Sequence, residues 1–313
     1  MHRTLHRGLL IAATMMVASV AITATPVTPA TAQPSRSTAA TIPSRGLPAL
    51  GNGACTVLWD LLNAGGRNGL VAIGLTDGQQ LIKFAANRPA LACTIGAVDL
   101  PGSEALIGID FRIQDGQLYG VGSTGGIFTL NTRTAAPTKV SQLTVALNGT
   151  SFGVDFNPAA DRLRIISDTG QNLRHNVNPG GTTIVDSPLT YPPATTAVGV
   201  TAAAYTNNDL NPTTATTLFD IDTTLDQVAL QSPANSGQLA ATGALGVDAN
   251  LQAGFDIHSP LRADRAVANN AYAVLNGIAG SRLYRVDVLT GEAQTTGTFL
   301  GHVVVDLALL LRQ

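Results

Sequence analysis

Charged side chains are scarce in this chain of 313 residues, and neither sign is in large excess. Lys, Arg, Asp and Glu make up 12% of the residues, about half the usual share, and the formal net charge is -2. A protein that binds nucleic acid needs a basic surface for the phosphates, and this chain has no such surplus of cations. We therefore expect no nucleic-acid partner. With 45% hydrophobic residues the chain can bury a core, which excludes a disordered polymer.

Cysteine is almost absent, with only Cys55 and Cys93 present. Two thiols cannot build a four-thiolate zinc site or a disulfide-rich miniprotein, and no C-x-x-C spacing indicates redox chemistry. In an exported chain, oxidising conditions favour a bridge over two free thiols, so we predict a structural disulfide between the two cysteines. Closing that loop would stabilise the fold by about 3 to 4 kcal/mol.

The N-terminus has the organisation of a secretory signal peptide. Arg3 and Arg7 precede an uncharged, mostly apolar run over residues 8–24, and Ala30 and Ala32 form an A-x-A cleavage pattern. The alternative is a permanent membrane anchor, but the apolar run is barely long enough to span a bilayer. We expect a signal peptide over residues 1–32, with cleavage after Ala32 or somewhat upstream, and an exported protein without stable membrane insertion.

The segment after the signal peptide is poor in large apolar residues. Residues 33–53 are mostly Pro, Thr, Ser and Ala, which cannot repay the entropy of ordering the backbone. We predict a flexible leader there and a single folded domain over residues 54–313.

Internal repeats dominate the folded part. Five segments share a short apolar strand, a polar turn and a second strand, over residues 80–98, 126–143, 172–189, 217–230 and 282–299. Upstream of most of them lies another pair of strands, the first of which carries Gly-x-Asp, as in Gly108-Ile109-Asp110. Sets of four strands recur about every 45 to 65 residues, and no long amphipathic helical pattern interrupts them. This arrangement predicts an all-β propeller rather than an α/β fold.

The two ends of the chain complement each other. The first hairpin, 80–98, lacks an upstream Gly-x-Asp strand, whereas a strand at 303–307 has no hairpin after it. Because an open ring would leave unpaired strand edges, we predict that this C-terminal strand is the innermost strand of the first blade. Five four-stranded blades result; six is the alternative, since the segment 198–205 lacks an obvious turn. Extra length at 236–251 and 258–270 predicts loops at one end of the last blade, where propellers vary their binding surfaces.

The same strands resemble a known family. The Gly-x-Asp strands, together with Leu118-Tyr119-Gly120-Val121, Leu218-Phe219-Asp220-Ile221-Asp222 and Gly246-Val247-Asp248, are similar to the family called domain of unknown function 4394. The resemblance covers residues 70–311 approximately. It implies a propeller-like, secreted or periplasmic bacterial protein, and it supplies no established catalytic residues.

An aspartate recurs in the predicted inner strands. Asp110, Asp155, Asp256 and Asp306 fall in one phase of these strands, with Thr201 in the fifth copy. Alternation puts Gly and Asp on the same strand face, so the carboxylates would gather near the axis, where crowding raises pKa values and attracts a cation or polar ligand. Alternatively, each Asp accepts backbone N–H bonds from a neighbouring blade. We favour this structural role, because folding requires a feature in nearly every blade and catalysis does not.

A glycoside hydrolase is the best enzyme hypothesis for this pattern, since such enzymes pair two carboxyl groups, one of them with a raised pKa. The chain has only two glutamates, and Glu292 lies in a Thr-Gly-Glu turn typical of solvent-exposed hairpins. The candidate catalytic residues are therefore Asp110, Asp155, Asp256 and Glu104.

Metal ligands are equally few. Asp256, His258, His302 and Asp306 flank the predicted junction between the last and first blades, and calcium suits such oxygen ligands. There is no H-E-x-x-H motif or EF-hand loop, so ordinary hydrogen-bonded loop histidines are the favoured interpretation and no cofactor is predicted.

These observations favour a secreted, monomeric propeller that binds an extracellular carbohydrate, peptide or protein on one rim of the ring, and a binding or scaffold protein over an enzyme. The alternative is a glycoside hydrolase-like enzyme that uses the axial aspartates. Aromatic residues are only 4% of the chain, which counts against sugar stacking, and we expect Tyr191, Tyr205 and Tyr272 to pack between blades.

Overall fold

The computed structural model describes Trp59 and residues 69–311, which belong to one of the two units of the chain, Ala49–Gln313. The predicted signal peptide, the leader and Cys55 lie outside the described residues. Within the described residues the chain is built from strands and three short 3-10 helices, η1 (Pro89–Leu91), η2 (Pro101–Ser103) and η3 (Ala234–Ser236). None of the helices in this part is long and apolar enough to cross a bilayer.

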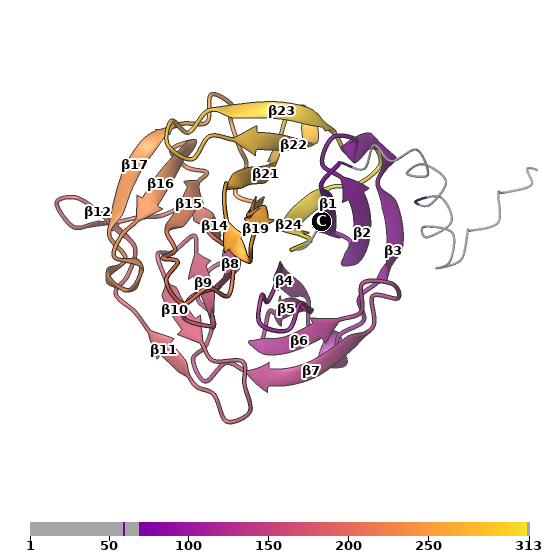
Figure 1. The fold of residues 1–313 in the computed structure, drawn as a ribbon, viewed down its shortest axis with the longest axis horizontal. Helices are drawn as coiled ribbons and strands as arrows, with labels where there is room; N and C mark the ends of the chain where they lie inside the picture. Colours follow the sequence, from indigo (N-terminus) through magenta and orange to yellow (C-terminus); the bar gives the residue numbers. More distant parts are fainter. Residues whose placement is uncertain (1–58, 60–68, 312–313) are drawn as a thin grey trace, which may run out of the picture. The chain divides into compact units, whose positions relative to one another are not determined.

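Five four-stranded antiparallel sheets account for most of the described residues, and Figure 1 shows them arranged as the blades of a wheel. From the axis outward, blade 1 contains β24 (Val304–Leu309), β1 (Val71–Thr76), β2 (Gln80–Ala85) and β3 (Cys93–Ala97). Blade 2 contains β4 (Leu106–Phe111), β5 (Leu118–Gly122), β6 (Gly126–Leu130) and β7 (Pro137–Gln142). Blade 3 contains β8 (Phe152–Asn157), β9 (Arg162–Ser167), β10 (Asn172–His175) and β11 (Thr183–Val185).

The last two blades follow the same plan and carry small insertions. Blade 4 contains β14 (Val200–Tyr205), β15 (Leu218–Asp222), β16 (Gln227–Gln231) and β17 (Leu239–Ala244). Blade 5 contains β18 (Ala253–His258), β21 (Asn270–Gly277), β22 (Gly280–Val286) and β23 (Ala293–Thr298). Two ribbons are inserted, β12 (Thr190–Tyr191) with β13 (Thr195–Thr196), and β19 (Leu261–Arg262) with β20 (Arg265–Ala266).

The C-terminal strand closes the ring. In Figure 1, the yellow β24 lies beside the indigo β1, and the two strands pair antiparallel, with Leu309 opposite Ala72 and Asp306 opposite Leu75. Each innermost strand contacts the next one, in the order β24, β4, β8, β14, β18 and back to β24. The predicted closure and the five-blade count are both confirmed.

Apolar side chains between neighbouring blades form the core. Every adjacent pair of blades shares one buried cluster, for example Leu75, Ile109 and Phe128 between blades 1 and 2. Between blades 5 and 1, the ring centroids of Phe84 and Phe299 lie 4.9 Å apart in an edge-to-face arrangement. Because each blade buries both faces of its inner strands, no blade is stable alone, and burial of the clusters stabilises the closed ring.

Glycine allows the innermost strands to approach each other closely. A Cβ on Gly153 would come within 2.7 Å of the Ala202 backbone, and one on Gly254 within 2.5 Å of the Asp306 Cα. Both distances are shorter than a carbon side chain tolerates, so the Gly of the Gly-x-Asp repeat is required by the narrow axis.

Blade 4 departs from the predicted arrangement. The hairpin over 217–230 was expected to be the outer pair of its blade, but β15 and β16 are the two middle strands. The outer strand is β17, in a segment predicted to be a loop, because its sequence Leu-Ala-Ala-Thr-Gly-Ala has almost no large apolar residue to mark it. Ladder hydrogen bonds to β16 hold it in place. The second predicted insertion, 258–270, is confirmed, since it contains the β19–β20 ribbon.

Candidate functional site

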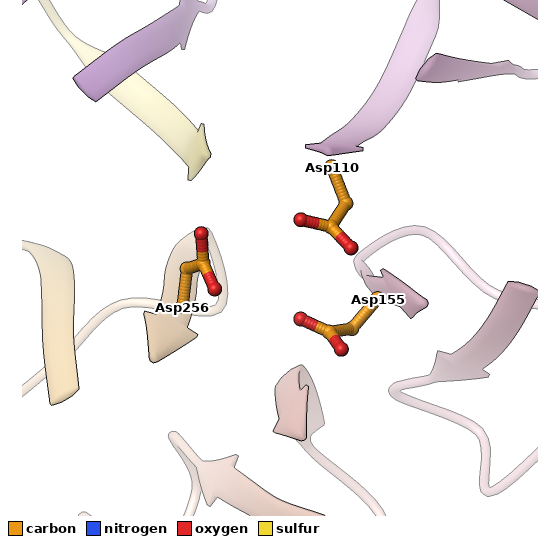
Figure 2. Close-up of side chains that lie close together, drawn as sticks. All are labelled: Asp110, Asp155 and Asp256. Atoms are coloured by element: carbon orange, nitrogen blue, oxygen red, sulfur yellow. The ribbon is translucent and has the colours of Figure 1, made fainter. Parts of the chain in front are cut away.

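Three aspartates meet at the axis of the ring. Asp110 lies on β4, Asp155 on β8 and Asp256 on β18, and one carboxylate oxygen of each lies within 4.8 Å of the other two (Figure 2). All three are buried, with exposed fractions of 6, 2 and 3%. The structure therefore brings together three of the four residues that the sequence indicated as catalytic candidates.

Each of these carboxylates joins its own blade to the next one. Oδ2 of Asp110 accepts the backbone N–H of Phe156 at 2.7 Å, which links blade 2 to blade 3. Oδ1 of Asp155 accepts the N–H of Tyr205 at 3.1 Å, and Oδ2 of Asp256 accepts the N–H of Leu309 at 2.6 Å. These bonds link blade 3 to blade 4 and blade 5 to blade 1. A hydrogen bond to a backbone donor, closed off from water, fixes the register between neighbouring inner strands.

Two inner strands carry alanine where the others carry this aspartate. The β-bulges at the start of β4, β14 and β24 allow these strands to be aligned with one another. In this alignment, the position of Asp110 is occupied by Ala204 in β14 and by Ala308 in β24. Blades 5 and 2, which follow these strands around the ring, therefore receive no carboxylate hydrogen bond from the preceding blade at this position. There, the N–H of Phe111 and of Ile257 donates instead to the aspartate of its own strand, at 2.6 and 2.5 Å. The buried N–H groups are thus satisfied in every blade, as burial requires.

Asp306 and Thr201 do not align with Asp110 in the register of the inner strands. Asp306 stands two positions earlier in the register, where β4 has Gly108, and Thr201 lies in the bulge of β14. Thr201 is displaced because the bulge adds one residue on β14, so spacing along the sequence no longer gives its register, whereas Asp306 stays on the same strand face as Asp110, since two positions are one full repeat of the alternation. Asp306 still links two blades, because its Oδ2 accepts the N–H of Ile109 at 2.7 Å and its Oδ1 that of Leu307 at 2.9 Å. This bond joins blade 1 to blade 2 through a different N–H group, since that of Phe111 donates to Asp110.

Burial dominates the electrostatics of this group. It raises the pKa of Asp110 and Asp155 well above the ordinary value, and the neighbouring aspartates raise both further. For Asp256, burial raises the pKa to about 7, although the N–H groups of Leu309 and Ile257 act in the opposite direction. Asp306 is raised as well, again mainly by burial. The charged form is disfavoured because water is excluded and like charges lie close together.

This arrangement can bind protons or a hard cation. Converging carboxylate oxygens are the ligands that Ca²⁺ prefers, so Asp110, Asp155 and Asp256 are the residues that would hold a metal ion at the axis. Most of their oxygens, however, already accept backbone N–H groups. Among the described residues, none donates a hydrogen bond to Oδ2 of Asp155.

The histidine candidates lie away from this group. His258 follows Asp256 by two residues on the same strand, and a rise of about 6 to 7 Å along the strand separates them. It is half-buried, its pKa is lowered by burial, and it bonds the backbone of Leu310. His302 lies in the turn before β24. Neither histidine nor Asp306 joins the converging carboxylates.

Glu104, the fourth catalytic candidate, does not join the converging carboxylates. It follows η2, and its Oε1 accepts the backbone N–H of Thr124 at 2.8 Å, the Thr124 hydroxyl at 2.7 Å and the N–H of Gly126 at 3.1 Å. These three bonds hold the β5–β6 turn. Cys93 begins β3 and is buried; its predicted partner Cys55 lies outside the described residues, so the disulfide stays a prediction.

The face of the ring at which the innermost strands end, here called the C-terminal face, carries two connected loops. Loop 206–217 joins β14 to β15, and loop 259–269 joins β18 to β21 and contains the β19–β20 ribbon. Asn207 and Asn269 bond reciprocally, N–H to Oδ1 and Nδ2 to Oδ1, both at 2.9 Å. Oδ2 of Asp209 accepts the N–H of Ala266 at 2.8 Å. The loops are therefore fixed to each other across the junction of blades 4 and 5.

Two pockets lie on the same face. The blade 1–2 pocket has a volume of about 530 Å³ and includes Ile73, Lys83, Phe111, Arg133, Leu310 and, from loop 206–217, Leu210. The blade 4–5 pocket has a volume of about 600 Å³ and is more polar, with Asn207, Asn269, Asn270, Arg285, Asp287 and Glu292. A pocket of about 140 Å³ lies where the innermost strands begin, near Ile107, Thr201 and Val305. The two larger volumes are in the range of small-molecule sites.

Comparison with known proteins identifies the family. A profile of the family described as Domain of unknown function (DUF4394) matches residues 80–308, which is most of the chain. The chain belongs to this family. The family that the Gly-x-Asp strands indicated is thereby confirmed. Among curated proteins, none matches this DUF4394 chain.

Solved structures are similar to the DUF4394 chain only at low identity. A nidogen/laminin complex matches over 77% of this chain and 98% of its own, with 10% identity and a TM-score of 0.45. A protein of unknown function from Bacteroides thetaiotaomicron VPI-5482 matches over 78% and 67%, with 14% identity and a TM-score of 0.44. Myxococcus xanthus glutaminyl cyclase matches over 66% and 83%, with 13% identity and a TM-score of 0.38. With scores this low, none of these likenesses carries an argument.

Two features of the DUF4394 chain were missed from its sequence. Loop 206–217 was not singled out, although its run Asn207-Asn208-Asp209 between two strands was a usable loop signal. Asp220 on β15 is fully buried, and neither of its oxygens has a hydrogen-bond partner among the described residues. Burial raises its pKa well above the ordinary value, with Arg164 acting in the opposite direction. No local pattern separates this residue from Asp222, whose carboxylate accepts three hydrogen bonds.

The tyrosines are placed mainly as expected. Tyr205 is 2% exposed and accepts a bond from Arg164 Nε at 3.2 Å. Tyr191 is half-buried and donates to Oδ2 of Asp222 at 3.0 Å, while the half-buried Tyr272 packs against the cluster between blades 5 and 1. These contacts occupy the rings in packing between elements.

Proposed function

We propose that the protein is an exported β-propeller that binds an extracellular carbohydrate, peptide or protein on its C-terminal face and catalyses no reaction. The observation that carries this proposal is the coincidence of three features on one face: loop 206–217, loop 259–269 and the two larger pockets. Loops fixed on a rigid scaffold are the usual place for recognition. Export is supported by the signal-peptide pattern of the N-terminus.

The blade 4–5 pocket offers hydrogen-bonding groups that suit a polar ligand. Asn270 and Arg285 line it, and neither side chain has a hydrogen bond to another described residue. The guanidinium of Arg285 is exposed and presents donors in a fixed plane, and the Asn270 amide presents both a donor and an acceptor. Sugar hydroxyls or peptide carbonyls match this set. Few aromatic side chains line this pocket, which favours hydrogen bonding over ring stacking as the means of ligand recognition.

The axial aspartates support a structural role over catalysis. Asp110, Asp155 and Asp256 are buried and accept backbone N–H groups that hold adjacent blades in register. A general acid and a nucleophile must both reach the scissile bond of the substrate, and these carboxylates are at most 6% exposed. The glycoside hydrolase alternative keeps one supporting observation, the approach of three raised-pKa carboxylates within 4.8 Å.

Affinity capture tests the binding proposal. The protein from residue 33 onward, immobilised and exposed to a native secretome and to a glycan array, should retain a ligand. Arg285→Ala and Asn270→Ala should each reduce retention by about tenfold, which corresponds to loss of a ligand hydrogen bond to a charged or amide group. Gln252→Ala, on the opposite face, is the matched control and should retain the ligand. Equal retention by wild type and Arg285→Ala, or no retention at all, would overturn the proposal.

A second assay addresses the enzyme alternative. Wild type, incubated with plant and bacterial polysaccharides, is expected to release no reducing ends. Release by wild type that is lost in Asp155→Asn would establish hydrolysis at the axis and refute the noncatalytic assignment.

A further inference from the structure

A serine and a histidine meet between the outer strands of blades 2 and 3. Ser141 lies on β7, the outermost strand of blade 2, and His175 is the last residue of β10 in blade 3. The Oγ of Ser141 lies 2.8 Å from Nε2 of His175, and the Oγ1 of Thr183 on β11 lies 3.0 Å from Nδ1. A hydroxyl, an imidazole and a third group that orients the ring form the arrangement that activates a serine nucleophile.

The contacts of the imidazole favour a proton on Nδ1 and leave Nε2 as the acceptor. The Thr183 hydroxyl can accept a hydrogen bond from Nδ1, and the backbone of Thr182 also bonds the ring and stabilises a proton on it. A backbone carbonyl only accepts, and Thr182 directly precedes Thr183, so both acceptors lie on the Nδ1 side of the ring. The Ser141 hydroxyl then donates to Nε2, as it must if the imidazole is to take its proton.

The surroundings of His175 keep the imidazole neutral. Its side chain is fully buried, and burial together with the nearby Arg162 guanidinium lowers the pKa of the ring. A neutral imidazole at pH 7 can accept a proton. Ser141, in contrast, is partly exposed. A reagent in solution can therefore approach the hydroxyl, while the base behind it is shielded from water.

We propose that Ser141 is a nucleophile that reacts with an activated acyl ester. In this step the serine oxygen bonds to the carbonyl carbon of the ester, and the bond from that carbon to the leaving oxygen breaks. The serine proton passes to Nε2 of His175 and from there to the leaving group, so the products are an acylated serine and a free alcohol. Neither of the two larger pockets includes these residues, and the inference does not depend on the proposed function.

The reaction should stop after one acyl group per chain. Rapid turnover requires N–H donors that stabilise the negatively charged oxygen of the intermediate. Two backbone N–H groups beside this pair, those of Thr144 and Thr183, already donate to each other's hydroxyl, at 2.9 and 3.1 Å. They are therefore not available to the intermediate, and Ser141 is a site of covalent modification that leaves the noncatalytic assignment in place.

An organophosphorus reagent tests the reactivity of the hydroxyl. Diisopropyl fluorophosphate forms a stable phosphate ester with an activated serine and releases fluoride, and peptide mass spectrometry locates the adduct. Ser123 is the internal reference, because it is exposed and its hydroxyl accepts the N–H of Ala105. In wild type, Ser141 should react at least about 100-fold faster than Ser123, the lower end of what a positioned base contributes.

Two substitutions separate the nucleophile from the base. Ser141→Ala should remove the adduct, and His175→Gln should lower the rate at Ser141 to that of Ser123, because an amide can bond the hydroxyl but does not take its proton. Ser123→Ala is the matched control and should react at Ser141 like wild type. Thermal melting checks the folding of each variant. The comparison of Ser141 with Ser123 in wild type needs no substitution, so it decides the question even if His175→Gln is unfolded.

Equal rates at Ser141 and Ser123 in wild type, or an unchanged rate at Ser141 in folded His175→Gln, would overturn the inference. With p-nitrophenyl acetate, wild type should release one p-nitrophenolate per chain in a burst that Ser141→Ala lacks. Sustained release that is lost in Ser141→Ala would keep the nucleophile but refute the noncatalytic part of the proposed function. Capture by the blade 4–5 pocket is measured separately, so it can succeed or fail independently of this reaction.

Discussion

Asp256 should make the protein less stable as the pH rises. In the folded chain its pKa is about 7, chiefly because it is buried, whereas the ordinary value is 3.8. Between about pH 4 and pH 7, the unfolded chain therefore releases this proton while the folded chain keeps it. Folding takes up a proton throughout this window, so the free energy of unfolding falls as the pH rises through it and levels off above pH 7.

The size of the effect follows from the shift. A difference of about three pH units at 1.36 kcal/mol each corresponds to about 4 kcal/mol lost between pH 4 and pH 8. Histidines act in the opposite direction, because burial lowers the pKa of His175 and His258 and the unfolded chain then binds protons first on acidification. Wild type alone would therefore mix the two contributions.

Comparison with Asp256→Asn separates the axial aspartates from the histidines. Because the charge of Asp256 also raises the pKa of Asp110, Asp155 and Asp306, the difference includes the change in their titration. The single amide carbonyl accepts one of the two N–H groups that Asp256 accepts, those of Leu309 and Ile257, and the side chain carries no titrating proton, while both histidines are unchanged. Urea unfolding at a series of pH values should show wild type losing about 4 kcal/mol relative to this variant from about pH 4.5 to pH 8. Asp248→Asn, at an exposed position, should follow wild type. A difference between wild type and Asp256→Asn that stays constant with pH, or grows in favour of wild type, would refute the electrostatic account.

Three further changes test the packing. Asp220→Leu should raise the free energy of unfolding at neutral pH by about 1 to 3 kcal/mol in urea titrations, because it removes two buried oxygens that have no hydrogen-bond partner among the described residues, whereas Asp248→Leu should change it by less than about 0.5 kcal/mol. Deleting 301–313 removes β24 and should abolish the cooperative melting transition, and an unchanged transition would contradict the ring closure. Cys93→Ser should lower stability by about 3 to 4 kcal/mol in oxidising buffer; no difference from wild type there would argue against the bridge to Cys55.

The blade repeat and the closure of the ring could be predicted from the sequence because both depend on local patterns. Alternating apolar residues mark strands, and turn residues mark their ends. The strand at 303–307 had no hairpin after it, and the hairpin at 80–98 had no inner strand before it. Pairing the two ends of the chain resolves both, and the pairing of β24 with β1 confirms this prediction. The axial convergence of Asp110, Asp155 and Asp256 followed from the same strand alternation.

Registers and partners could not be predicted in this way. The bulge in β14 displaced Thr201 from the strand face that residue spacing gave it, and Asp306 lies two positions earlier in the register than Asp110. The donors to the axial carboxylates lie on other blades, as with Phe156 for Asp110, so no local motif shows that these oxygens are engaged. β17 was missed for a related reason: its small residues carry no apolar pattern, and only pairing with β16 makes it a strand.

The amino-acid sequence by itself determined the strand periodicity and the residues that face the axis, because these depend on neighbours within a few positions along the chain, and it favoured five blades over six. Tertiary structure alone decided which carboxylates link blades, which buried aspartate has no hydrogen-bond partner in the described part of the chain, and where pockets open on the C-terminal face. Those properties arise from groups that are distant in the chain, and the free energy that brings them together comes from burial between blades.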